Sequence, residues 1–361
     1  MSCFSKKDSI VRTLVDEIVS GKYDPLGLFP SEHQLVIRFK SSRTTVRSAV
    51  QVLEEKGFVY RRQGAGTFVY GLHQRGRIRI GTLFSGGRYS EIFPRIEREI
   101  VRAAQVDGLE VVCADASMIN YDSVGSKAVE LARNLVKKDV KGVVFQPVEF
   151  SADRSRANAE ILDVFAQAKV PVVLVDCDAE LPSGWSNLDL VSLDNFAAGR
   201  DLAMHLRERR VQRVSFVARR GCADSVWQRL SGLLSVFGAE SVDCLFVPDC
   251  SNVAGLCDAL SSLSKLDTVV CQNDVAAVNV AKALGRKGLL IPRDVMLTGF
   301  DDVALASAMR PGLTTVRQPY EQIARIAYQR LRERMSGSTD PVVATALHGT
   351  LVVRGTTEIY R

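Results

Sequence analysis

Apolar residues near the start of the chain recur at the spacing of an α-helix in three successive stretches. The first predicts a helix that ends near Gly21, the second a short helix with Ser31 as its N-cap, and the third a helix that ends at Gly57. The residues expected to face inward are Ile10, Leu14, Val15 and Ile18, then Leu35, Val36 and Phe39, then Val46, Ala49, Val50 and Leu53. The pattern therefore predicts three amphipathic helices.

The hydrophobic period then changes from that of a helix to that of a strand. Residues 58–62 and 67–70 are short strand candidates, and the glycine-rich segment 63–66 between them is typical of a hairpin tip. Three helices followed by a basic hairpin predict a small winged helix-turn-helix domain over residues 1–70. The polar, glycine-punctuated segment 71–78 is expected to be a linker.

From residue 79 to residue 361, apolar strand candidates alternate with amphipathic helical stretches. The strand candidates are Ile80–Phe84, Leu109–Cys113, Gly142–Phe145, Val170–Val175, Val214–Val217, Cys244–Val247, Thr268–Cys271 and Val295–Thr298. Val-rich strands separated by helices predict an α/β fold with parallel sheets covered on both faces. This number of strands fits two doubly wound lobes, and ligands in such folds bind at the carboxyl ends of the strands, here facing a cleft between lobes.

The positive charge is concentrated at one end of the chain. The net charge is +6, yet residues 1–80 hold 14 Lys and Arg against 7 Asp and Glu, which leaves 33 bases and 34 acids for the rest. A basic module for a polyanion, joined to a nearly neutral body, explains this asymmetry. An ordinary solvated basic surface is the alternative on charge alone.

Several classes of protein are disfavoured by what the sequence lacks. No apolar run approaches the ~20 residues of a membrane helix and the N-terminus has no apolar signal core, so we expect a cytoplasmic protein without membrane contact. The eight cysteines are scattered without zinc-ligand spacing, which favours free thiols and no metal. Phosphate-loop, metalloprotease, hydrolase and dinucleotide motifs are missing, so we expect neither catalysis nor a cofactor.

The segment Ser42–Arg47 is predicted to form the first turn of the third helix, where free backbone N–H groups and the helix dipole attract phosphate. Arg43 and Arg47 lie four residues apart on one face and can reach guanine edges or phosphates. Glycines at the hairpin tip let the backbone approach a minor groove. The candidate DNA-contacting residues are Ser31, Ser42, Arg43, Thr44, Thr45, Arg47, Arg61, Gln63 and Gly64. The alternative is a surface helix with incidental arginines.

The order of these residues resembles the DNA-binding domain of the GntR family along residues 8–70. The matching motifs are Pro30-Ser31-Glu32-x-x-Leu35, Ser42-Arg43-Thr44-Thr45-Val46-Arg47-x-Ala49, Gly57, and Gly64-x-Gly66-Thr67-Phe68-Val69. The family usually has Pro-Gly ahead of the first motif, whereas this chain has Pro25-Leu26-Gly27-Leu28-Phe29. That departure affects a loop outside the expected contacts. The resemblance implies binding to double-stranded operator DNA.

A second set of motifs is spread through residues 79–336. They are Val191-x-x-Asp194-Asn195-x-x-x-Gly199, Arg229-Leu230-x-Gly232, Asn273-Asp274-x-x-Ala277, Ile291-Pro292-x-Asp294-Val295, Gly299-Phe300-Asp301-Asp302 and Pro311-x-Leu313-Thr314-Thr315-Val316-x-Gln318-Pro319. They resemble the periplasmic-binding-protein-like effector domain of LacI/GalR repressors. Together with a GntR-like head, the chain is similar to the arabinose-repressor type. The lack of a LacI-type hinge helix in residues 71–78 fits that exchange of heads.

Polar side chains at the predicted strand ends form the candidate effector site. Arg229 offers a bidentate donor to vicinal hydroxyls, and the resemblance implies that it contacts a sugar; Asp274 can accept two sugar O–H groups. Phe93 can either stack on a sugar ring or fill the core. The candidate set is Ser85, Arg88, Tyr89, Phe93, Gln146, Asp176, Arg229, Asn273, Asp274 and Asp301. Asp194-Asn195 and Asp302 are better explained as helix caps.

The sequence thus predicts a DNA-binding transcriptional regulator that responds to a small molecule. By resemblance the body forms a homodimer, the two heads bind a palindromic operator, and a sugar effector releases the repressor. A corepressor-dependent repressor is the closer alternative, because pentose, hexose and nucleobase pockets share this scaffold. A cytoplasmic sugar-binding protein or carbohydrate enzyme with an accessory head is the alternative from another class.

Overall fold

The computed structural model describes residues 6–20, 22–23, 27–55, 58–62, 65–69, 78–85, 91–116, 121–149, 151–184, 186–262 and 266–358. The chain divides into two compact units, one made of residues 1–80 with 101–111 and the other of residues 81–100 with 112–361. We call residues 6–69 the head and residues 78–358 the body. Within the described ranges, no helix combines the length and the apolarity needed to cross a bilayer.

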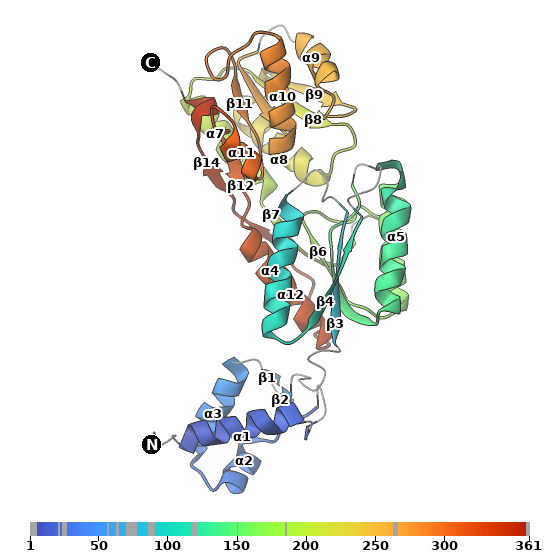
Figure 1. The fold of residues 1–361 in the computed structure, drawn as a ribbon, viewed down its shortest axis with the longest axis vertical. Helices are drawn as coiled ribbons and strands as arrows, with labels where there is room; N and C mark the ends of the chain where they lie inside the picture. The colour runs from blue at the N-terminus through green and yellow to red at the C-terminus, as the bar shows by residue number, and fades with distance from the viewer. Residues whose placement is uncertain are drawn as a thin grey trace. The chain divides into compact units, whose positions relative to one another are not determined.

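The head contains the three predicted helices, α1 (Lys6–Ser20), α2 (Glu32–Phe39) and α3 (Arg43–Glu55) (Figure 1). The Ser31 hydroxyl accepts a hydrogen bond from the Gln34 backbone N–H, and the Gln34 side chain accepts one from the Ser31 N–H, so the predicted N-cap is confirmed as a complete capping box. The apolar face of each helix lies in one core, made of Ile10, Val11, Leu14, Ile18, Phe29, Leu35, Val46, Ala49, Val50, Leu53, Val59 and Val69.

The predicted wing is confirmed and is larger than the sequence indicated. Strands β1 (Val59–Arg62) and β2 (Gly66–Val69) pair antiparallel, with Val59 opposite Val69. Residues 27–29 add to β2, because the Phe29 N–H donates to the Thr67 carbonyl at 2.7 Å and the Val69 N–H donates to the Gly27 carbonyl at 2.9 Å. Leu28 forms an isolated bridge to Phe68, and Phe29 lies in the head core, so residues 27–29 extend the wing without forming a strand of their own.

The first lobe of the body is built on a six-stranded sheet in the order β13-β7-β6-β5-β3-β4. The strands are β3 (Arg79–Phe84), β4 (Glu110–Asp115), β5 (Val140–Phe145), β6 (Val172–Val175), β7 (Asp189–Leu193) and β13 (Ala344–Leu347), and the helices are α4 (Ile92–Val106), α5 (Tyr121–Lys137), α6 (Arg154–Gln167) and α12 (Tyr320–Met335). The neighbouring pairs among β5, β6, β7 and β13 are parallel. Helices α5 and α12 cover opposite faces of the sheet (Figure 1).

The second lobe is built on a four-stranded sheet in the order β11-β10-β8-β9, in which every neighbouring pair is parallel. Its strands are β8 (Val214–Arg219), β9 (Val242–Val247), β10 (Thr268–Cys271) and β11 (Met296–Thr298), and its helices are α7 (Asn195–Glu208), α8 (Asp224–Phe237), α9 (Val253–Ser261), α10 (Asp274–Arg286) and α11 (Ala304–Ala308). Phe216 packs with residues of α7 and α8, whereas its neighbour Val217 packs with residues of α9 and α10. The sheet is therefore covered on both faces, as predicted.

Three connections join the two lobes. The chain passes to the second lobe after β7, returns between β12 (Thr315–Arg317) and α12, and passes again between β13 and β14 (Thr350–Val352). Strands β12 and β14 pair antiparallel, with Val316 opposite Leu351. The carboxyl ends of β7 and β12 thus both lead from one lobe into the other, close to the polar side chains described below.

All eight strands predicted for the body are present, with ends shifted by a few residues, and four further strands in the described part of the body were missed. β7 alternates buried and half-buried residues with Asp189 and Ser192 among them, so it lacks the continuous apolar run of the predicted strands. β13 at the sheet edge alternates between exposed and half-buried. β12 and β14 contain only three residues each, which is too short for a periodic signal.

Candidate functional site

The exposed face of α3 carries the predicted DNA-contacting side chains. Ser42, Arg43, Thr44 and Arg47 are exposed and Thr45 is half-buried, while Val46, Ala49 and Val50 face the head core. Among the described residues, no carboxylate lies within 4.0 Å of the guanidinium of Arg43 or Arg47. Two cations without a protein counter-charge on one helix face are suited to a polyanion.

The start of α3 is fixed by its own hydroxyl groups. The Ser42 Oγ accepts a hydrogen bond from the Thr45 backbone N–H at 3.1 Å and lies 2.8 Å from the Thr45 Oγ1. Ser42 therefore caps the helix, and this use of its hydroxyl competes with a contact to DNA. The Ser31 hydroxyl is likewise occupied at the start of α2, because it accepts a hydrogen bond from the Gln34 backbone N–H. Both assignments to DNA remain predictions.

Arg61 at the wing is engaged inside the head. Its guanidinium lies 3.0 Å from a carboxylate oxygen of Glu32 and 3.3 Å from one of Glu54, so it links β1 to α2 and α3. In this arrangement the Arg61 charge is compensated, in contrast to the charges of Arg43 and Arg47. The other predicted wing residues, Gln63 and Gly64, lie outside the described residues.

The body contains a cavity at the carboxyl ends of strands from both lobes. Its volume is about 800 Å³ when the solvent-filled space at its mouth is counted. The lining residues are Ile92, Phe93, Glu149, Asp176, Arg219, Ser225, Val226, Arg229, Asp249, Cys250, Ser251, Gln272, Asn273, Val275, Ala276, Asn279, Asp301 and Gln318.

Arg229 is held rigidly at the cavity wall. Its Nε donates to the Asn195 Oδ1 at 2.8 Å, its Nη1 donates to the Gln272 carbonyl at 2.7 Å, and its guanidinium lies 4.7 Å from the centre of the Phe300 ring. Only 4% of the residue is exposed. Because both hydrogen-bond partners are uncharged, the charge of Arg229 stays available to a ligand.

Two glycines explain how Asn195 reaches Arg229. A Cβ on Gly199 of α7 would lie 2.1 Å from the Arg229 carbonyl oxygen, and one on Gly232 of α8 would lie 2.2 Å from the Phe196 carbonyl oxygen. Helices α7 and α8 therefore touch backbone to backbone, which only glycine permits at these two positions. The contact brings the start of α7, where Asn195 lies, against the guanidinium.

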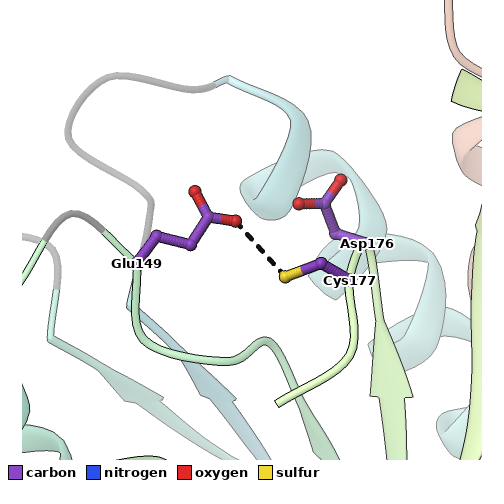
Figure 2. A group of neighbouring side chains, drawn as sticks. All are labelled: Glu149, Asp176 and Cys177. Atoms are coloured by element: carbon purple, nitrogen blue, oxygen red, sulfur yellow. Dashed lines mark hydrogen bonds between the residues drawn. The ribbon is translucent and has the colours of Figure 1, made fainter. Parts of the chain in front are cut away.

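The first-lobe wall carries two neighbouring acids. Figure 2 shows the carboxylates of Glu149, which follows β5, and Asp176, which follows β6, turned toward the same space. One carboxylate oxygen of Glu149, one of Asp176 and the Cys177 Sγ all lie within 4.8 Å of one another. The Cys177 thiol donates a hydrogen bond to the Glu149 Oε1 at 3.5 Å. Burial, followed by the proximity of Asp176, raises the pKa of Glu149 well above its usual value, and burial also raises the pKa of Asp176.

These three residues are the one group of potential metal ligands that the described part of the chain brings together. Burial raises the pKa of the Cys177 thiol well above its usual value, so the sulfur keeps its proton and is a poor ligand. Two carboxylates remain, which favours a hydrogen-bonded or charged organic group over a transition metal. The scattered cysteine spacing gave no sign of this grouping, because the trio forms only when two neighbouring strands end side by side.

Asp301 lies at the second-lobe wall in a strained conformation. Its φ is 108°, and that of Asp176 is 75°, values that cost L-residues about 1–3 kcal/mol and concentrate at functional sites. The Asp301 carboxylate accepts from the Gln318 Nε2 at 2.8 Å, and its carbonyl accepts from the Tyr320 hydroxyl. Burial raises the pKa of Asp301 to about 6, although Arg229 and Gln318 oppose the rise.

The structure brings together about half of the predicted effector residues. Phe93, Asp176, Arg229, Asn273 and Asp301 line the cavity. Phe93 also packs against the Phe84 ring at 5.8 Å, so it contributes to the core while it lines the cavity, and its stacking on a sugar stays a prediction. Asn273 lines the wall while its side chain caps α10 by accepting from the Ala276 N–H at 2.9 Å. Arg88 and Tyr89 lie outside the described residues.

Ser85 and Gln146 bond to each other and do not line the cavity. The Gln146 Oε1 accepts from both the backbone N–H and the hydroxyl of Ser85 at 2.9 Å, and Gln146 is fully buried. Gln146 in turn donates to the Glu149 Oε1 at 3.3 Å. The two residues therefore support the strand ends and position Glu149, rather than facing the cavity as expected.

Asp274 does not face the cavity either, which corrects its predicted placement. The residue is 0% exposed; its Oδ1 accepts from the Thr315 hydroxyl at 2.6 Å and its Oδ2 accepts from the Val303 N–H at 2.9 Å. The carboxylate joins α10 to the segments before α11 and at β12, which leaves no free oxygen for a ligand. Its position right after a strand was correct, but the helix turns its side chain inward.

The predicted caps have different outcomes. Asp194 caps α7 by accepting from the Ala197 N–H at 2.8 Å, as predicted, whereas Asn195 is buried and holds Arg229. Asp302 is not a cap, because its carboxylate accepts from the Arg317 Nε at 2.6 Å and the Arg354 Nη2 at 2.7 Å. Although burial opposes it, these two arginines lower the pKa of Asp302.

Several lining residues were missed by the sequence analysis. Glu149, Asp249 and Gln272 follow β5, β9 and β10 within a few residues, so a search of every strand end would have found them. Asn279 lies within α10, and Gln318 precedes α12 in the crossover from the second lobe. No local pattern marks Asn279, and the motif that contains Gln318 did not indicate that this side chain reaches the cavity, because only the tertiary fold carries the two residues there.

Family comparisons match each part of the chain separately. Residues 6–69 match the family described as bacterial regulatory proteins, gntR family, and residues 203–357 match a periplasmic binding protein-like domain. The chain is 24% identical over 361 residues to the arabinose metabolism transcriptional repressor of Geobacillus stearothermophilus, covering 94% of each chain.

Solved structures share the fold of the body. A LacI family transcriptional regulator from Enterococcus faecium with bound ribose is similar with a TM-score of 0.64 and 19% identity, covering 78% of this chain and all of the other. A complex of the transcriptional regulator CelR with cellobiose has a TM-score of 0.64 and 21% identity, covering 88% of this chain and 92% of the other.

Proposed function

The chain is a regulator that joins a gntR-family DNA-binding domain to a periplasmic-binding-protein-like domain, and from this premise we propose a transcriptional repressor controlled by a small polar effector. The observation that carries the proposal is the cavity at the strand ends, where the fixed cation Arg229 lies among carboxylates and amides. A sugar is the first candidate effector, because similar proteins are named for arabinose metabolism or were solved with ribose or cellobiose.

The head supplies the affinity for DNA. Arg43 and Arg47 project from the exposed face of α3 without protein counter-charges among the described residues, so they can pair with phosphates or guanine edges at little desolvation cost. Thr44 and Thr45 flank them on the same first turn. Arg61 contributes mainly by holding the wing against α2 and α3, unless DNA displaces Glu32 and Glu54.

The body supplies the control. A ligand that contacts Asp176 in one lobe and Arg229 and Asp301 in the other favours the arrangement in which both walls meet it. Three connections between the lobes provide places where such a change is absorbed. We propose a homodimer in the cytoplasm whose two heads read a palindromic operator, and a role in binding rather than catalysis.

A gel-shift titration tests the proposal. The full chain is incubated with the promoter fragment of its own gene and of neighbouring genes, and a panel of pentoses, hexoses, disaccharides and nucleobases is added. We expect nanomolar binding that one class of compound weakens by 5- to 150-fold, the usual range of allosteric coupling. Absence of sequence-specific binding at physiological salt would overturn the proposal.

The same titration decides between induction and corepression. Linkage requires that an effector which weakens operator binding be bound more weakly by the operator complex, by the same factor. We expect release, which is the sign predicted from the sequence for a sugar effector. Tighter operator binding in the presence of the compound would make it a corepressor.

A further inference from the structure

Among the described residues, the acids at the centre of the cavity have no ion-pair partner. Glu149 and Asp176 in the first lobe and Asp301 in the second all lie near the single guanidinium of Arg229 and feel its charge. Among the described residues, none of these three carboxylates lies within 4.0 Å of a Lys, Arg or His nitrogen. Arg229 itself is bonded to the neutral oxygens of Asn195 and Gln272. Within the described part of the chain, the acids at the centre of the cavity therefore outnumber the cations, and the raised pKa of Glu149 lets the Glu149–Asp176 pair keep one proton until a cation arrives.

The other charged groups of the lining do not change this balance. Asp249 accepts hydrogen bonds from the Ser251 N–H at 2.8 Å and from the Ser251 hydroxyl at 2.7 Å, so it is satisfied within its own loop. Arg219 at the end of β8 adds one cation, which offsets that acid. The neighbouring acids Glu149 and Asp176 therefore remain without an ion-pair partner among the described residues, and a carboxylate oxygen of one lies within 4.8 Å of a carboxylate oxygen of the other.

We propose that the effector carries a positive charge, as a protonated amine on a small hydroxylated scaffold, and that this amine is held between the carboxylates of Glu149 and Asp176. This inference rests on the proposed function, since it specifies the ligand of the same cavity. Two carboxylates facing one space form charge-assisted hydrogen bonds with an ammonium group, which are stronger than those with a hydroxyl. Asn279 and the NH2 groups of Gln272 and Asn273 are available to hydroxyl groups, while the amide oxygens of Gln272 and Asn273 accept from the backbone N–H groups of Arg219 and Ala276.

The same geometry disfavours anionic effectors. A phosphate or carboxylate group placed near Glu149 and Asp176 would meet like charges in a water-poor site, where repulsion is large. Arg229 and Arg219 belong to the second-lobe elements α8 and β8, so an anion would have to bind against that wall alone. An amino-substituted polyol can form favourable interactions with both walls, with its amine at the carboxylates of the first lobe and its hydroxyl groups at Arg229 and Asp301.

Substituting Glu149 or Asp176 by its uncharged amide tests the recognition of charge without disturbing the fold. Glu149→Gln and Asp176→Asn keep the shape of the side chains and remove charges that burial opposes, so both variants should fold at least as well as the parent chain. Asn is suited to position 176 because it tolerates the positive φ of 75° there. The matched control is Asp163→Asn, which neutralises an exposed acid on α6 of the same lobe.

The experiment measures ligand binding by the full chain in matched sets. D-glucosamine and D-galactosamine are each compared with the parent sugar, the N-acetyl derivative and the 6-phosphate, together with 2-aminopropane-1,3-diol as a fragment, by thermal shift and isothermal titration. We expect the amines to bind about 10- to 100-fold more tightly than their neutral partners, corresponding to one charge-assisted interaction. Glu149→Gln should remove that preference, and Asp163→Asn should keep it.

Each outcome bears on the inference. Equal affinity for amine and parent sugar, tighter binding of the phosphates, or no amine-dependent shift at all would overturn it. A shift caused by Ca²⁺ or Zn²⁺ alone, reversed by chelator and lost in Glu149→Gln, would also overturn it in favour of a metal. If a neutral sugar releases the operator, the proposed function stands and this inference fails; loss of operator binding altogether would instead remove the proposed function.

Discussion

Glu91, at the start of α4 in the first lobe, accepts a hydrogen bond from the Ala304 backbone N–H at the start of α11 in the second lobe, with an Oε2–N distance of 3.1 Å. Next to it, the Arg95 guanidinium lies 5.1 Å from the centre of the Tyr320 ring, whose hydroxyl donates to the Asp301 carbonyl. First-lobe side chains on α4 are thus linked to the second-lobe wall of the cavity.

Replacing Glu91 by Ala should weaken effector binding without affecting DNA binding by the free protein. The hydrogen bond ties the lobes together in the arrangement in which residues of both lobes line the cavity, so its loss should lower ligand affinity about 2- to 10-fold. Isothermal titration with the compound that alters operator binding measures this effect. Glu160→Ala, at an acid on α6 of the same lobe, is the control and should leave affinity unchanged. Unchanged affinity in Glu91→Ala would show that the bond does not contribute to closure.

Arg47→Ala should weaken operator binding by about 1–3 kcal/mol, and Arg43→Ala should have an effect of the same sign. Both side chains are exposed on α3 and lack ion-pair partners among the described residues, so their removal costs little stability. Gel-shift affinities at physiological salt provide the measurement. Arg12→Ala on the exposed face of α1 is the matched control. If Arg43→Ala and Arg47→Ala bind the operator as tightly as Arg12→Ala does, the head contacts DNA through another face.

The head should lose stability in acid because of one ion pair. Glu17 of α1 accepts from Arg38 of α2 and from Lys22, and the bond from Arg38, opposed by burial, leaves the pKa of Glu17 lowered from 4.5 to about 2. A lowered pKa stabilises the fold above about pH 4.5, and that contribution is lost as the pH falls toward about 2. Hydrogen exchange of the α1 peptides in the full chain should show this loss. In Glu17→Gln the acid dependence should disappear, while Asp16→Asn, at an exposed neighbour, should retain it.

The sequence predicted the architecture well because periodicity reports which faces are buried. The helices of the head and the apolar strands of the body depend on local patterns such as Leu14–Ile18 and Val269–Cys271, and they are present. The site was predicted less completely because orientation is a tertiary property. Asp274 and Asp301 both follow strands, yet the first turns inward to Thr315 while the second reaches the cavity with a φ of 108°. No spacing in the sequence distinguishes these two acids.

Gly199→Ala should disturb the site from a distance. Its Cβ would lie 2.1 Å from the Arg229 carbonyl oxygen, so α7 must move away from α8 and Asn195 must lose its bond to the guanidinium. We expect a loss of about 1–3 kcal/mol in stability together with weaker effector binding. Gly285→Ala on α10, where nothing lies within 4 Å of the added Cβ, should be neutral or stabilising. Denaturant unfolding and ligand titration measure both effects, and equal behaviour of the two variants would contradict the role given to the α7–α8 contact.

The affinity for an amine effector should rise with pH. In the free protein, burial and the proximity of Asp176 raise the pKa of Glu149 well above its usual value, so the pair retains a proton that an incoming ammonium must displace. The other titratable or charged groups near the pair are Cys177, Cys222, Arg229 and Asp301. Asp301, with a pKa of about 6, gains its negative charge as the pH rises, and its ionisation acts in the same direction.

Binding therefore releases a proton, and affinity should increase with pH, by at most about tenfold per pH unit, over the range in which the pair is protonated in the free protein and the amino sugar keeps its charge. Titration of D-glucosamine at several pH values, and in two buffers of different ionisation enthalpy, measures the released proton directly. Glu149→Gln should flatten most of this dependence, because the displaced proton is no longer present, and Asp301→Asn should remove the smaller remainder. An affinity that falls as pH rises would mean that the protonated pair donates to the ligand, and the effector would then be a neutral acceptor rather than an amine.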